Sequence, residues 1–365
     1  MQLILKVILM EIDYINGAKT DEMCGVSKYQ LEIHQRLKKL KINKIEYNPE
    51  SFVIKGINLA NILKLYISYP ILIRSRVKKS NVKHITSQNL AYILNFLNLY
   101  NCIITCYDLI PLIYEKSYTS NFNLTGLKKA DRIITISEFS KNEIIKYVGY
   151  PQNKIDVIYP AVNHDVYNKT GDRHIIKELN IPENSKIVLY VGSEQPRQNV
   201  PNVIKAFSEV KKRISSIKLI KIGRPQFYGA REQILELIDE LSLKEDVFFI
   251  DYVSEEDLPK WYNAADVLVY PCEYAGFGLP PLEAMACGTP VITSNTTSLP
   301  EVVGDAGIMI DPHDIKLMSE NIYQILTNEG LRNDLSEKGI ERSKFFTWDN
   351  AAKKTYKVYE LLNNY

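Results

Sequence analysis

YPCEYAGFGLPPLEAMACGTP, residues Tyr270–Pro290, decides how the rest of this sequence is interpreted. The run VLVY at Val267–Tyr270 is apolar and β-branched, which predicts a buried strand. The run LEAMAC at Leu282–Cys287 consists of helix formers and ends at Gly288, which predicts a helix. Between them, two glycines leave backbone N–H groups accessible, and two prolines suit the first turn of a helix. A strand, turn and helix of this composition is typical of a phosphate-binding site.

Glu283 falls in the first turn of the predicted helix. From there its two carboxylate oxygens would be able to accept both hydroxyls of a ribose. The alternative is a capped strand–turn–helix with an ordinary surface glutamate. An isolated G-x-G pattern would favour that alternative, so other segments of the chain have to support a nucleotide site.

The stretch resembles the signature loop of retaining glycosyltransferases of the GT-B fold, the family 4 group that uses nucleotide-sugar donors. In that family the loop usually reads E-G-F-G-L-P-x-x-E. Ala275 stands where the first glutamate is usual, and the nearest upstream carboxylate is Glu273. The residues that match, and that the resemblance assigns to donor binding, are Gly276, Phe277, Gly278, Leu279 and Glu283.

Bulk composition describes an ordinary globular protein. The 365 residues are 45% hydrophobic and 24% charged, which is enough for two α/β domains with separate cores. No apolar run reaches the length of a membrane span, and the N-terminus lacks a cleavage site, so we expect a buried first strand at Leu3–Met10. Five cysteines in no metal-ligand spacing indicate a reduced compartment and a cytoplasmic protein, with Cys102 and Cys106 in the core.

Charge is divided unevenly along the chain. Residues 1–165 carry a net +8 and residues 166–365 a net −6. Residues 51–100 contain seven basic side chains and no acidic one. This basic half would suit peripheral contact with an anionic membrane at its inner face, or a phosphate-bearing acceptor; a solvated basic face is the alternative. Nucleic acid is not expected, because the basic stretch shows no recognised motif with interleaved aromatic residues.

Strand-like and helix-like runs alternate through both halves, which predicts doubly wound parallel sheets. Turn residues from Pro160 to Asp172 indicate a connection between two domains. Ser298-Leu-Pro-Glu301 has capping-box spacing and predicts a short helix. The expected strands are Leu3–Met10, Val82–Ile85, Asn101–Cys106, Arg132–Ile136, Ile155–Ile158, Lys186–Val191, Leu219–Ile222, Val247–Ile250, Val267–Tyr270, Val291–Thr293 and Ile308–Ile310.

Five further segments resemble the family. GSEQPRQN, residues 192–199, is similar to the segment whose Arg and Lys grip the donor diphosphate; Arg197 matches, and Gln198 replaces the lysine. YDLIP, residues 107–111, is similar to H-D-L-x-P, so the resemblance places Tyr107 and Asp108 beside the reacting sugar. A tyrosine would hydrogen-bond the sugar but is a poor base near neutral pH. Asp108 as a cap of the following segment is an equal alternative.

The three remaining segments are weaker. Gly25, in CGVSKY, would let the donor phosphates approach the backbone. Ser137, in SEFSK, lies at a segment that borders the cleft in the family, although a plain N-cap with Glu138 in the first turn is the stronger interpretation. Val253 lies in a segment whose backbone contacts the nucleobase in the family, where Ser254 is also explained as a helix cap.

The resemblance therefore implies an α/β protein of the GT-B fold, with two Rossmann-like domains facing across a cleft. Residues 1–165 would form the acceptor domain, residues 166–349 the donor domain, and helix 350–365 would pack back on the first. The implied function is transfer of a hexose from a GDP- or UDP-sugar to a hydroxyl on a glycan or lipid-linked saccharide, with retention at the anomeric carbon. No cofactor beyond the nucleotide sugar and no metal is expected.

Tyr107, Gln198 and Ala275 each depart from the family pattern at the donor's sugar or diphosphate. Removing one good electrostatic contact commonly costs about a hundredfold in rate. The departures therefore leave a second hypothesis open: a nucleotide-sugar-binding or partner-binding protein with little or no catalysis. The sequence does not determine the sugar, the base, the acceptor or the oligomeric state.

Overall fold

The computed structural model describes residues 10–17, 25–37, 40–46, 63–115, 121, 122 and 124–363. The chain divides into two compact units. The first comprises residues 1–160 with residues 348–365, and the second comprises residues 161–347. The boundaries predicted at 165 and 349 lie close to these, and the last helix belongs to the first unit.

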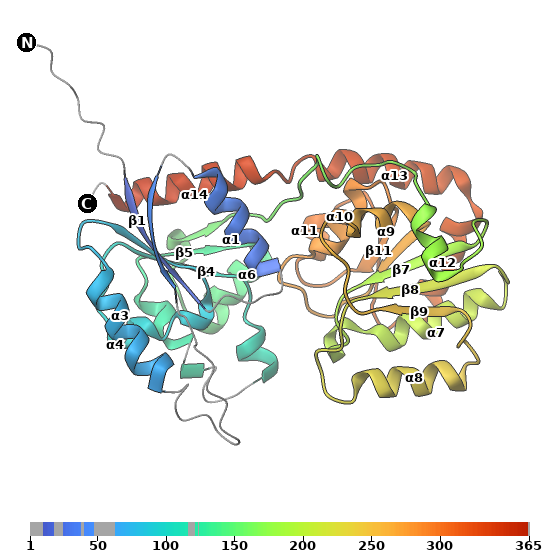
Figure 1. Ribbon diagram of the computed structural model, residues 1–365, viewed down its shortest axis with the longest axis horizontal. Helices are drawn as coiled ribbons and strands as arrows, with labels where there is room; N and C mark the ends of the chain where they lie inside the picture. Colours follow the sequence, from blue (N-terminus) through green and yellow to red (C-terminus); the bar gives the residue numbers. More distant parts are fainter. Residues whose placement is uncertain are drawn as a thin grey trace, which may run out of the picture. The chain divides into compact units, whose positions relative to one another are not determined.

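The first unit is built on a parallel sheet of order β2-β1-β3-β4-β5-β6 (Figure 1). Its strands are β1 (Glu11–Asn16), β2 (Lys41–Glu46), β3 (Val82–Ile85), β4 (Cys102–Cys106), β5 (Arg132–Thr135) and β6 (Ile155–Val157). Its longer helices are α1 (Gly25–Arg36), α3 (Tyr69–Arg76), α6 (Glu138–Glu143) and α14 (Trp348–Asn363). Shorter helical segments are η1 (Lys64–Ser68), η2 (Gln88–Leu90), α4 (Ile93–Phe96), η3 (Pro111–Glu115), η4 (Thr125–Lys129), η5 (Ile144–Val148) and η6 (Gln152–Lys154).

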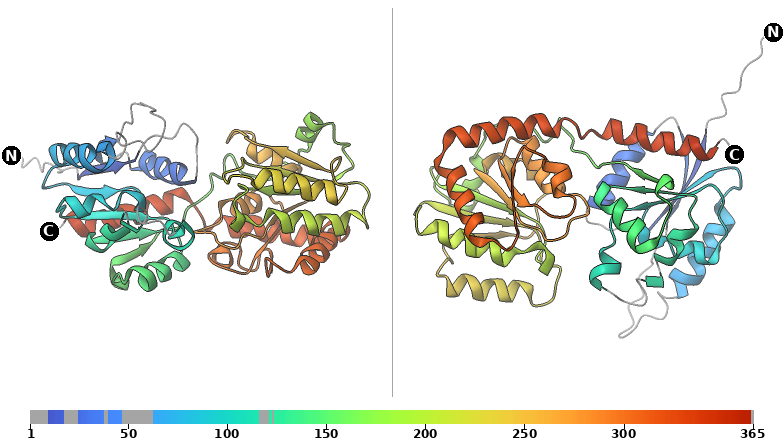
Figure 2. Two further views of the ribbon diagram at one scale, coloured as in Figure 1. Left: turned by 90° about the horizontal axis from the view of Figure 1, so that it is seen from below. Right: turned by 180° about the vertical axis from the view of Figure 1, so that it is seen from behind.

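Alternation along the strands gives this sheet two different faces, because successive side chains of a strand point to opposite sides. On one face, Ile85 and Ile104 pack in a continuous apolar core with Tyr69 of α3. On the other face, His84 is hydrogen-bonded at Nδ1 to Tyr359 Oη of α14 (2.6 Å) and at Nε2 to Thr105 Oγ1 (2.7 Å). Figures 1 and 2 show α14 on one side of this sheet and α3 on the other.

The first strand was predicted at Leu3–Met10. Residues 3–9 lie outside the described residues, and β1 begins at Glu11, directly after the predicted run. Asp13 lies in the middle of β1 and is fully buried. Its carboxylate accepts hydrogen bonds from the Asn43 and Asn81 amides and from the backbone N–H of Lys78. A buried carboxylate with three donors is tolerated, and these donors come from three separate segments.

The second unit has a parallel sheet of order β12-β11-β10-β7-β8-β9. Its strands are β7 (Lys186–Val191), β8 (Ile217–Ile222), β9 (Val247–Ile250), β10 (Val267–Tyr270), β11 (Val291–Ser294) and β12 (Ile308–Ile310). Its helices are η7 (His174–Leu179), η8 (Pro196–Gln198), α7 (Val200–Lys211), α8 (Ala230–Glu240), α9 (Leu258–Ala264), α10 (Leu279–Ala286), α11 (Leu299–Val303), α12 (Ile315–Thr327) and α13 (Glu329–Ser343). Every strand predicted in this half is present within two residues of its predicted ends.

The strand order of the second unit reverses between β7 and β10, which are neighbours in the sheet. In open α/β sheets, ligands bind outside the carboxyl ends of strands at such a switch point. Two loops meet there: residues 192–199 after β7 and residues 271–278 after β10. They are the two loops that the family resemblance assigns to donor binding.

No helix in the described part of the chain is long and apolar enough to cross a membrane. Four cysteines, Cys102, Cys106, Cys272 and Cys287, are buried free thiols. Cys24 lies outside the described residues.

Candidate functional site

The signature loop (residues 275–283) turns sharply at Gly278. Its φ is +112°, in the left-handed region, and a Cβ at this position would lie 2.5 Å from Cδ2 of Leu299. Only glycine therefore satisfies both the backbone and the packing. Pro280 and Pro281 follow in the first turn of α10, where a missing N–H breaks no helical hydrogen bond. The loop backbone at Gly276–Leu279 thus leads directly into a helix N-terminus.

Ser298 holds this loop in place. Its Oγ lies 2.8 Å from the carbonyl oxygen of Ala275 and 2.7 Å from that of Phe277, and the hydroxyl is completely buried. The capping-box spacing correctly predicted that a helix, α11, begins after Ser298. The hydroxyl makes no cap hydrogen bond, however, and binds the signature loop instead. Sequence spacing found the helix and missed this role, because the loop lies more than twenty positions away.

Glu283 is buried, so the surface-glutamate alternative is wrong. The hydroxyl of Tyr262, from α9, donates to Oε2 of Glu283 at 3.0 Å. Burial, reinforced by the Glu283 charge, raises the pKa of Tyr262 well above its usual value, so Tyr262 remains a donor. The same two causes raise the pKa of Tyr167, whose ring centroid lies 6.3 Å from that of Tyr262. Two tyrosines, neither found from the sequence, therefore fix the orientation of this carboxylate.

Arg197 follows β7 and reaches across to the segment after β10. Its Nη1 donates to the carbonyl oxygen of Tyr274 at 3.0 Å, while its own carbonyl accepts from the N–H of Glu273 at 2.8 Å. Its Nε atom is buried and has no hydrogen-bond partner among the described residues. A buried donor without an acceptor is costly, and an anionic ligand is one way to satisfy it.

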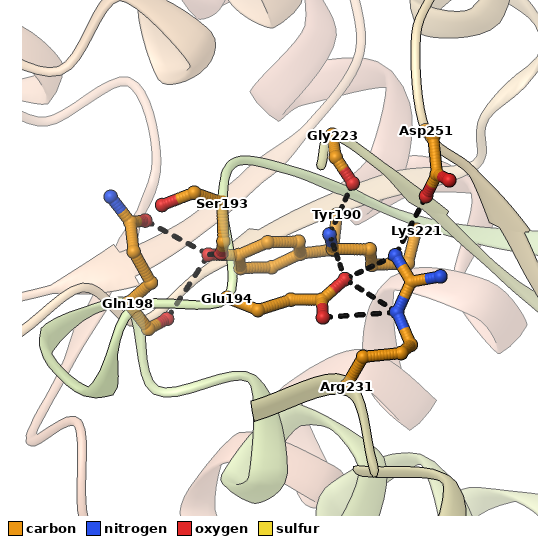
Figure 3. A network of polar contacts seen from close by, with 8 residues as sticks. All are labelled: Tyr190, Ser193, Glu194, Gln198, Lys221, Gly223, Arg231 and Asp251. Carbon is orange, nitrogen blue, oxygen red and sulfur yellow. Dashed lines mark hydrogen bonds and ion pairs between the residues drawn. The ribbon is translucent and has the colours of Figure 1, made fainter. Parts of the chain in front are cut away.

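Gln198, which stands where the family pattern has a lysine, is held by buried tyrosines. Its Oε1 accepts a hydrogen bond from the hydroxyl of Tyr190 at 2.9 Å (Figure 3). The side chain is buried, and a Cβ on Gly192 would lie 3.0 Å from this oxygen. Burial raises the pKa of Tyr270, and a hydrogen bond from Gln198 partly opposes that shift. The amide is therefore engaged by two tyrosines whose rings stack 6.2 Å apart.

Figure 3 also shows an ion-pair cluster beside the same loop. Glu194 Oε1 lies 2.6 Å from Lys221 Nζ, and both side chains are buried. Arg231 binds Glu194 through Nε at 2.9 Å and Asp251 through Nη2 at 2.7 Å. Burial lowers the pKa of Lys221, and the hydrogen bond to Glu194 opposes that shift. These contacts fasten the loop after β7 to β8, α8 and the end of β9, which the sequence did not predict.

Ala275 and Glu273 take separate positions. Ala275 is buried, and its N–H donates to Thr297 Oγ1 at 3.3 Å, so the loop backbone there is held at both polar atoms. The carboxylate of Glu273 lies 3.6 Å from Nε2 of His313. The main chain of Glu273 is therefore bonded to Arg197, whereas its carboxylate lies beside the exposed His313.

In the first unit, Tyr107 is buried at the carboxyl end of β4. Its hydroxyl accepts from the Gln30 amide at 3.3 Å, and its N–H donates to Gln88 Oε1 at 3.1 Å. Its ring meets that of Tyr29 edge-on, with centroids 5.6 Å apart. Hydrogen bonds and packing thus fix both the backbone and the ring of Tyr107.

Ser137 is the N-cap of α6, as its stronger interpretation predicted: its Oγ accepts from the N–H of Ser140 at 3.0 Å. Ser140 Oγ donates in turn to the carbonyl of Tyr107 at 3.2 Å, so Ser137 and Tyr107 belong to one hydrogen-bond network. Asp108 Oδ1 accepts from the N–H of Ile110 at 3.0 Å, which is the local capping contact expected as its alternative. Gly25 is the exposed first residue of α1.

Val253, the remaining predicted site residue, lies partly exposed after β9. Ser254 beside it accepts from the N–H of Asp257 at 3.1 Å, ahead of α9. Among the described residues, no group of three or more His, Cys, Asp or Glu side chains is arranged to hold a metal ion.

Comparison with known proteins places these features in a family. Residues 172–342 match the family model described as "Glycosyl transferases group 1", and residues 35–166 match "Glycosyltransferase Family 4". The chain belongs to the group 1, family 4 glycosyltransferases. The two models meet near the boundary between the two units.

Among relatives of this chain, the O-antigen chain mannosyltransferase B of Escherichia coli is 36% identical over 244 residues. The match spans 65% of this chain and 62% of that protein, so the chain aligns with less than two thirds of that relative's length.

Solved structures identify the fold as GT-B. The sucrose-phosphate synthase of Thermosynechococcus elongatus has a TM-score of 0.77 at 20% identity, covering 97% of this chain and 99% of its own. Anabaena Alr3699/HepE, solved in complex with UDP-glucose, has a TM-score of 0.76 at 16% identity, covering 98% and 100%. At these identities the likeness concerns the fold.

Proposed function

We propose that this glycosyltransferase transfers a hexose from a nucleotide-diphosphate sugar to a hydroxyl of a glycan or lipid-linked saccharide, with retention at the anomeric carbon. One observation carries the proposal: the Gly278 turn, the buried Glu283 (the fifth residue of α10) and the Arg197 Nε that has no partner among the described residues all follow β7 or β10, at one sheet switch point. The mannosyltransferase relative and the neighbour solved with UDP-glucose support a hexose donor. Mannose is our first choice of sugar for that reason.

The proposed chemistry breaks the bond between the anomeric carbon and the diphosphate oxygen. The acceptor oxygen forms its bond to that carbon on the same face, and its proton passes to the departing phosphate. Products are the glycoside and a nucleoside diphosphate. Arg197 and the backbone N–H groups of Gly276–Leu279 would stabilise charge that grows on the diphosphate. Glu283 would hold the ribose, and the backbone at Val253 would contact the base.

In the first unit, Tyr107 would hydrogen-bond the transferred sugar, with Asp108 beside it. The network through Gln30, Gln88 and Ser140 fixes Tyr107, as a positioning role requires. We propose that the reaction proceeds without a metal, because the guanidinium and N–H groups meet the diphosphate charge; turnover should then survive EDTA. The proposed location is cytoplasmic, with peripheral contact at the inner face of the membrane.

A nucleotide-sugar-binding protein with little catalysis is the second candidate. Two observations favour it: Ala275 brings no carboxylate to the loop, and Gln198 is engaged by tyrosines rather than presented as a cation. The binding residues would be unaffected, so both candidates predict nucleotide binding.

One experiment separates the two. Calorimetry would measure binding of UDP and GDP, and a coupled assay would measure slow donor hydrolysis and transfer to a set of acceptors. Measurable turnover from UDP- or GDP-sugars, raised by Ala275→Glu, supports the transferase. Tight nucleotide binding without turnover, in both the natural chain and Ala275→Glu, supports the binding protein. Failure to bind either nucleotide would refute both.

A further inference from the structure

The loop after β7, residues 192–199, carries a buried carboxylate three positions before Arg197. The side chain of Glu194 is fully buried and lies between two cations. Lys221 Nζ donates to its Oε1 at 2.6 Å, and Arg231 Nε donates to both of its oxygens at 2.9 Å (Figure 3). Lys221 belongs to β8 and Arg231 to the first turn of α8, so the carboxylate joins the loop to two other elements.

Both cations have further partners that fix them. Lys221 Nζ also donates to the carbonyl oxygen of Gly223, in the loop after β8, at 2.5 Å. Gly223 has a φ of +127°, and a Cβ there would lie 2.3 Å from the carbonyl oxygen of Gly192. The loops after β7 and β8 therefore touch backbone to backbone where Lys221 binds them. Arg231 Nη2 donates to Asp251 at 2.7 Å, at the end of β9.

Folding stability alone does not explain a buried ion pair of this kind. Taking both charges out of water costs free energy, and apolar side chains of similar volume often give an equally stable or more stable protein. Charge-assisted hydrogen bonds do fix the geometry of the groups they join. Arg197 depends on such fixing, because its Nη1 is bonded to the Tyr274 carbonyl whereas its Nε has no partner in the described chain.

We propose that Glu194 is a positioning residue for the donor diphosphate. Held by Lys221 and Arg231, it fixes the loop after β7 so that Arg197 is already in place when the phosphates arrive. Its own carboxylate would repel a diphosphate, so it acts through Arg197 and not by contact with the donor. The inference rests on the proposed function, since the diphosphate is the ligand that Arg197 would bind.

A double replacement in the full chain tests the proposal. Glu194→Leu/Lys221→Met removes both charges at similar volume, and Arg231 keeps Asp251 as its partner. We expect the melting temperature to stay the same or rise. In contrast, Kd for GDP or UDP, measured by calorimetry, should rise about tenfold, and kcat for hydrolysis of the donor sugar should fall at least about tenfold. A pair with only a structural role would change the melting temperature and leave Kd and kcat as they were.

A double-mutant cycle tests whether the effect passes through Arg197. In an Arg197→Ala background, Glu194→Leu/Lys221→Met should change Kd by less than about twofold, because the group that the pair positions is then absent. An undiminished effect in that background would overturn the proposal and would indicate that Lys221 meets the donor directly. Glu194→Gln keeps the shape of the side chain without its charge, and it should raise Kd about threefold even where the double replacement does not fold.

The matched control is Lys218→Met/Asp246→Leu in the same unit. Asp246 also binds two cations, Lys218 at 2.7 Å and Lys211 at 2.6 Å. It directly precedes β9 and so lies at the amino end of the parallel sheet, whereas the donor loops follow the carboxyl ends. This control should leave Kd and kcat unchanged.

The outcomes separate this inference from the proposed function. If the natural chain binds GDP or UDP, and the Glu194→Leu/Lys221→Met chain binds it equally well with the same kcat, the positioning role is overturned and the proposed function stands. If the control weakens binding as much as the test variant does, the positioning role is again overturned. If the natural chain binds neither nucleotide, the proposed function fails, and this inference fails with it.

Discussion

Replacing Ser298 with alanine tests whether the signature loop depends on a side chain outside it. Ser298 is completely buried, and its hydroxyl serves the carbonyls of Ala275 and Phe277 at 2.8 and 2.7 Å. The substitution leaves buried acceptors without a donor, at a cost of about 1–3 kcal/mol. For a unit of this size, each kcal/mol of lost stability lowers the melting temperature by roughly 2–4 °C. A loss of about 2 kcal/mol, the middle of the expected range, should therefore lower the melting temperature by about 4–8 °C.

Nucleotide affinity is the informative second measurement. Loop N–H groups that are loosened must be ordered again when the diphosphate binds, so Kd for GDP or UDP should rise about fivefold, or about 1 kcal/mol. Ser343→Ala is the matched control, because buried Ser343 donates only to Ile340 within α13, at 2.8 Å. It should lower stability by about 1 kcal/mol and leave Kd unchanged. Equal effects of the two variants on Kd would refute the reasoning.

Two further predictions concern buried polar pairs. Tyr262→Phe removes the hydrogen-bond donor to Glu283 Oε2. We expect calorimetry to show weaker nucleotide binding and less discrimination between GDP and 2′-deoxy-GDP. Unchanged discrimination would contradict the ribose role of Glu283. Burial lowers the pKa of His84 to about 3, so between pH 6.5 and that value the unfolded chain binds a proton that the folded chain does not. The free energy of unfolding should therefore fall by about 1.4 kcal/mol per pH unit as the pH drops below 6.5. Urea unfolding at pH 7 and pH 5 should show that His84→Gln removes this contribution. Parallel pH profiles of the variant and the natural chain would contradict the prediction.

The second half of the fold was predictable because its signals are local. Apolar β-branched runs gave the strands, and the glycines and prolines of the signature loop marked the turn. The first half was predicted less well. β1 and β2 carry charged residues, and the burial of Asp13 is only understandable once Asn43 and Asn81 are known to donate to it.

The candidate site divides in the same way. The sequence and its family resemblance identified the turn at Gly278, the helix that follows it, and Arg197 and Glu283 as candidate donor-binding residues. The sequence missed what the Ser298 hydroxyl does: the spacing suggested a cap, whereas the hydroxyl binds loop carbonyls that lie beside it only in the folded sheet. It also did not predict the contact of the Gln198 amide with Tyr190; the diphosphate contact of Gln198 stays a prediction.

The sequence by itself therefore determined the backbone chemistry of the loop, since a glycine in the left-handed region and prolines in a first helical turn are requirements of neighbouring residues. Tertiary structure alone decided which polar groups are partnered. The Glu283 carboxylate is held by Tyr262 from another helix, whereas the buried Nε of Arg197 has no partner in the described chain. Hydrogen bonds of buried side chains join distant positions, so only the packed fold shows which groups remain for a ligand.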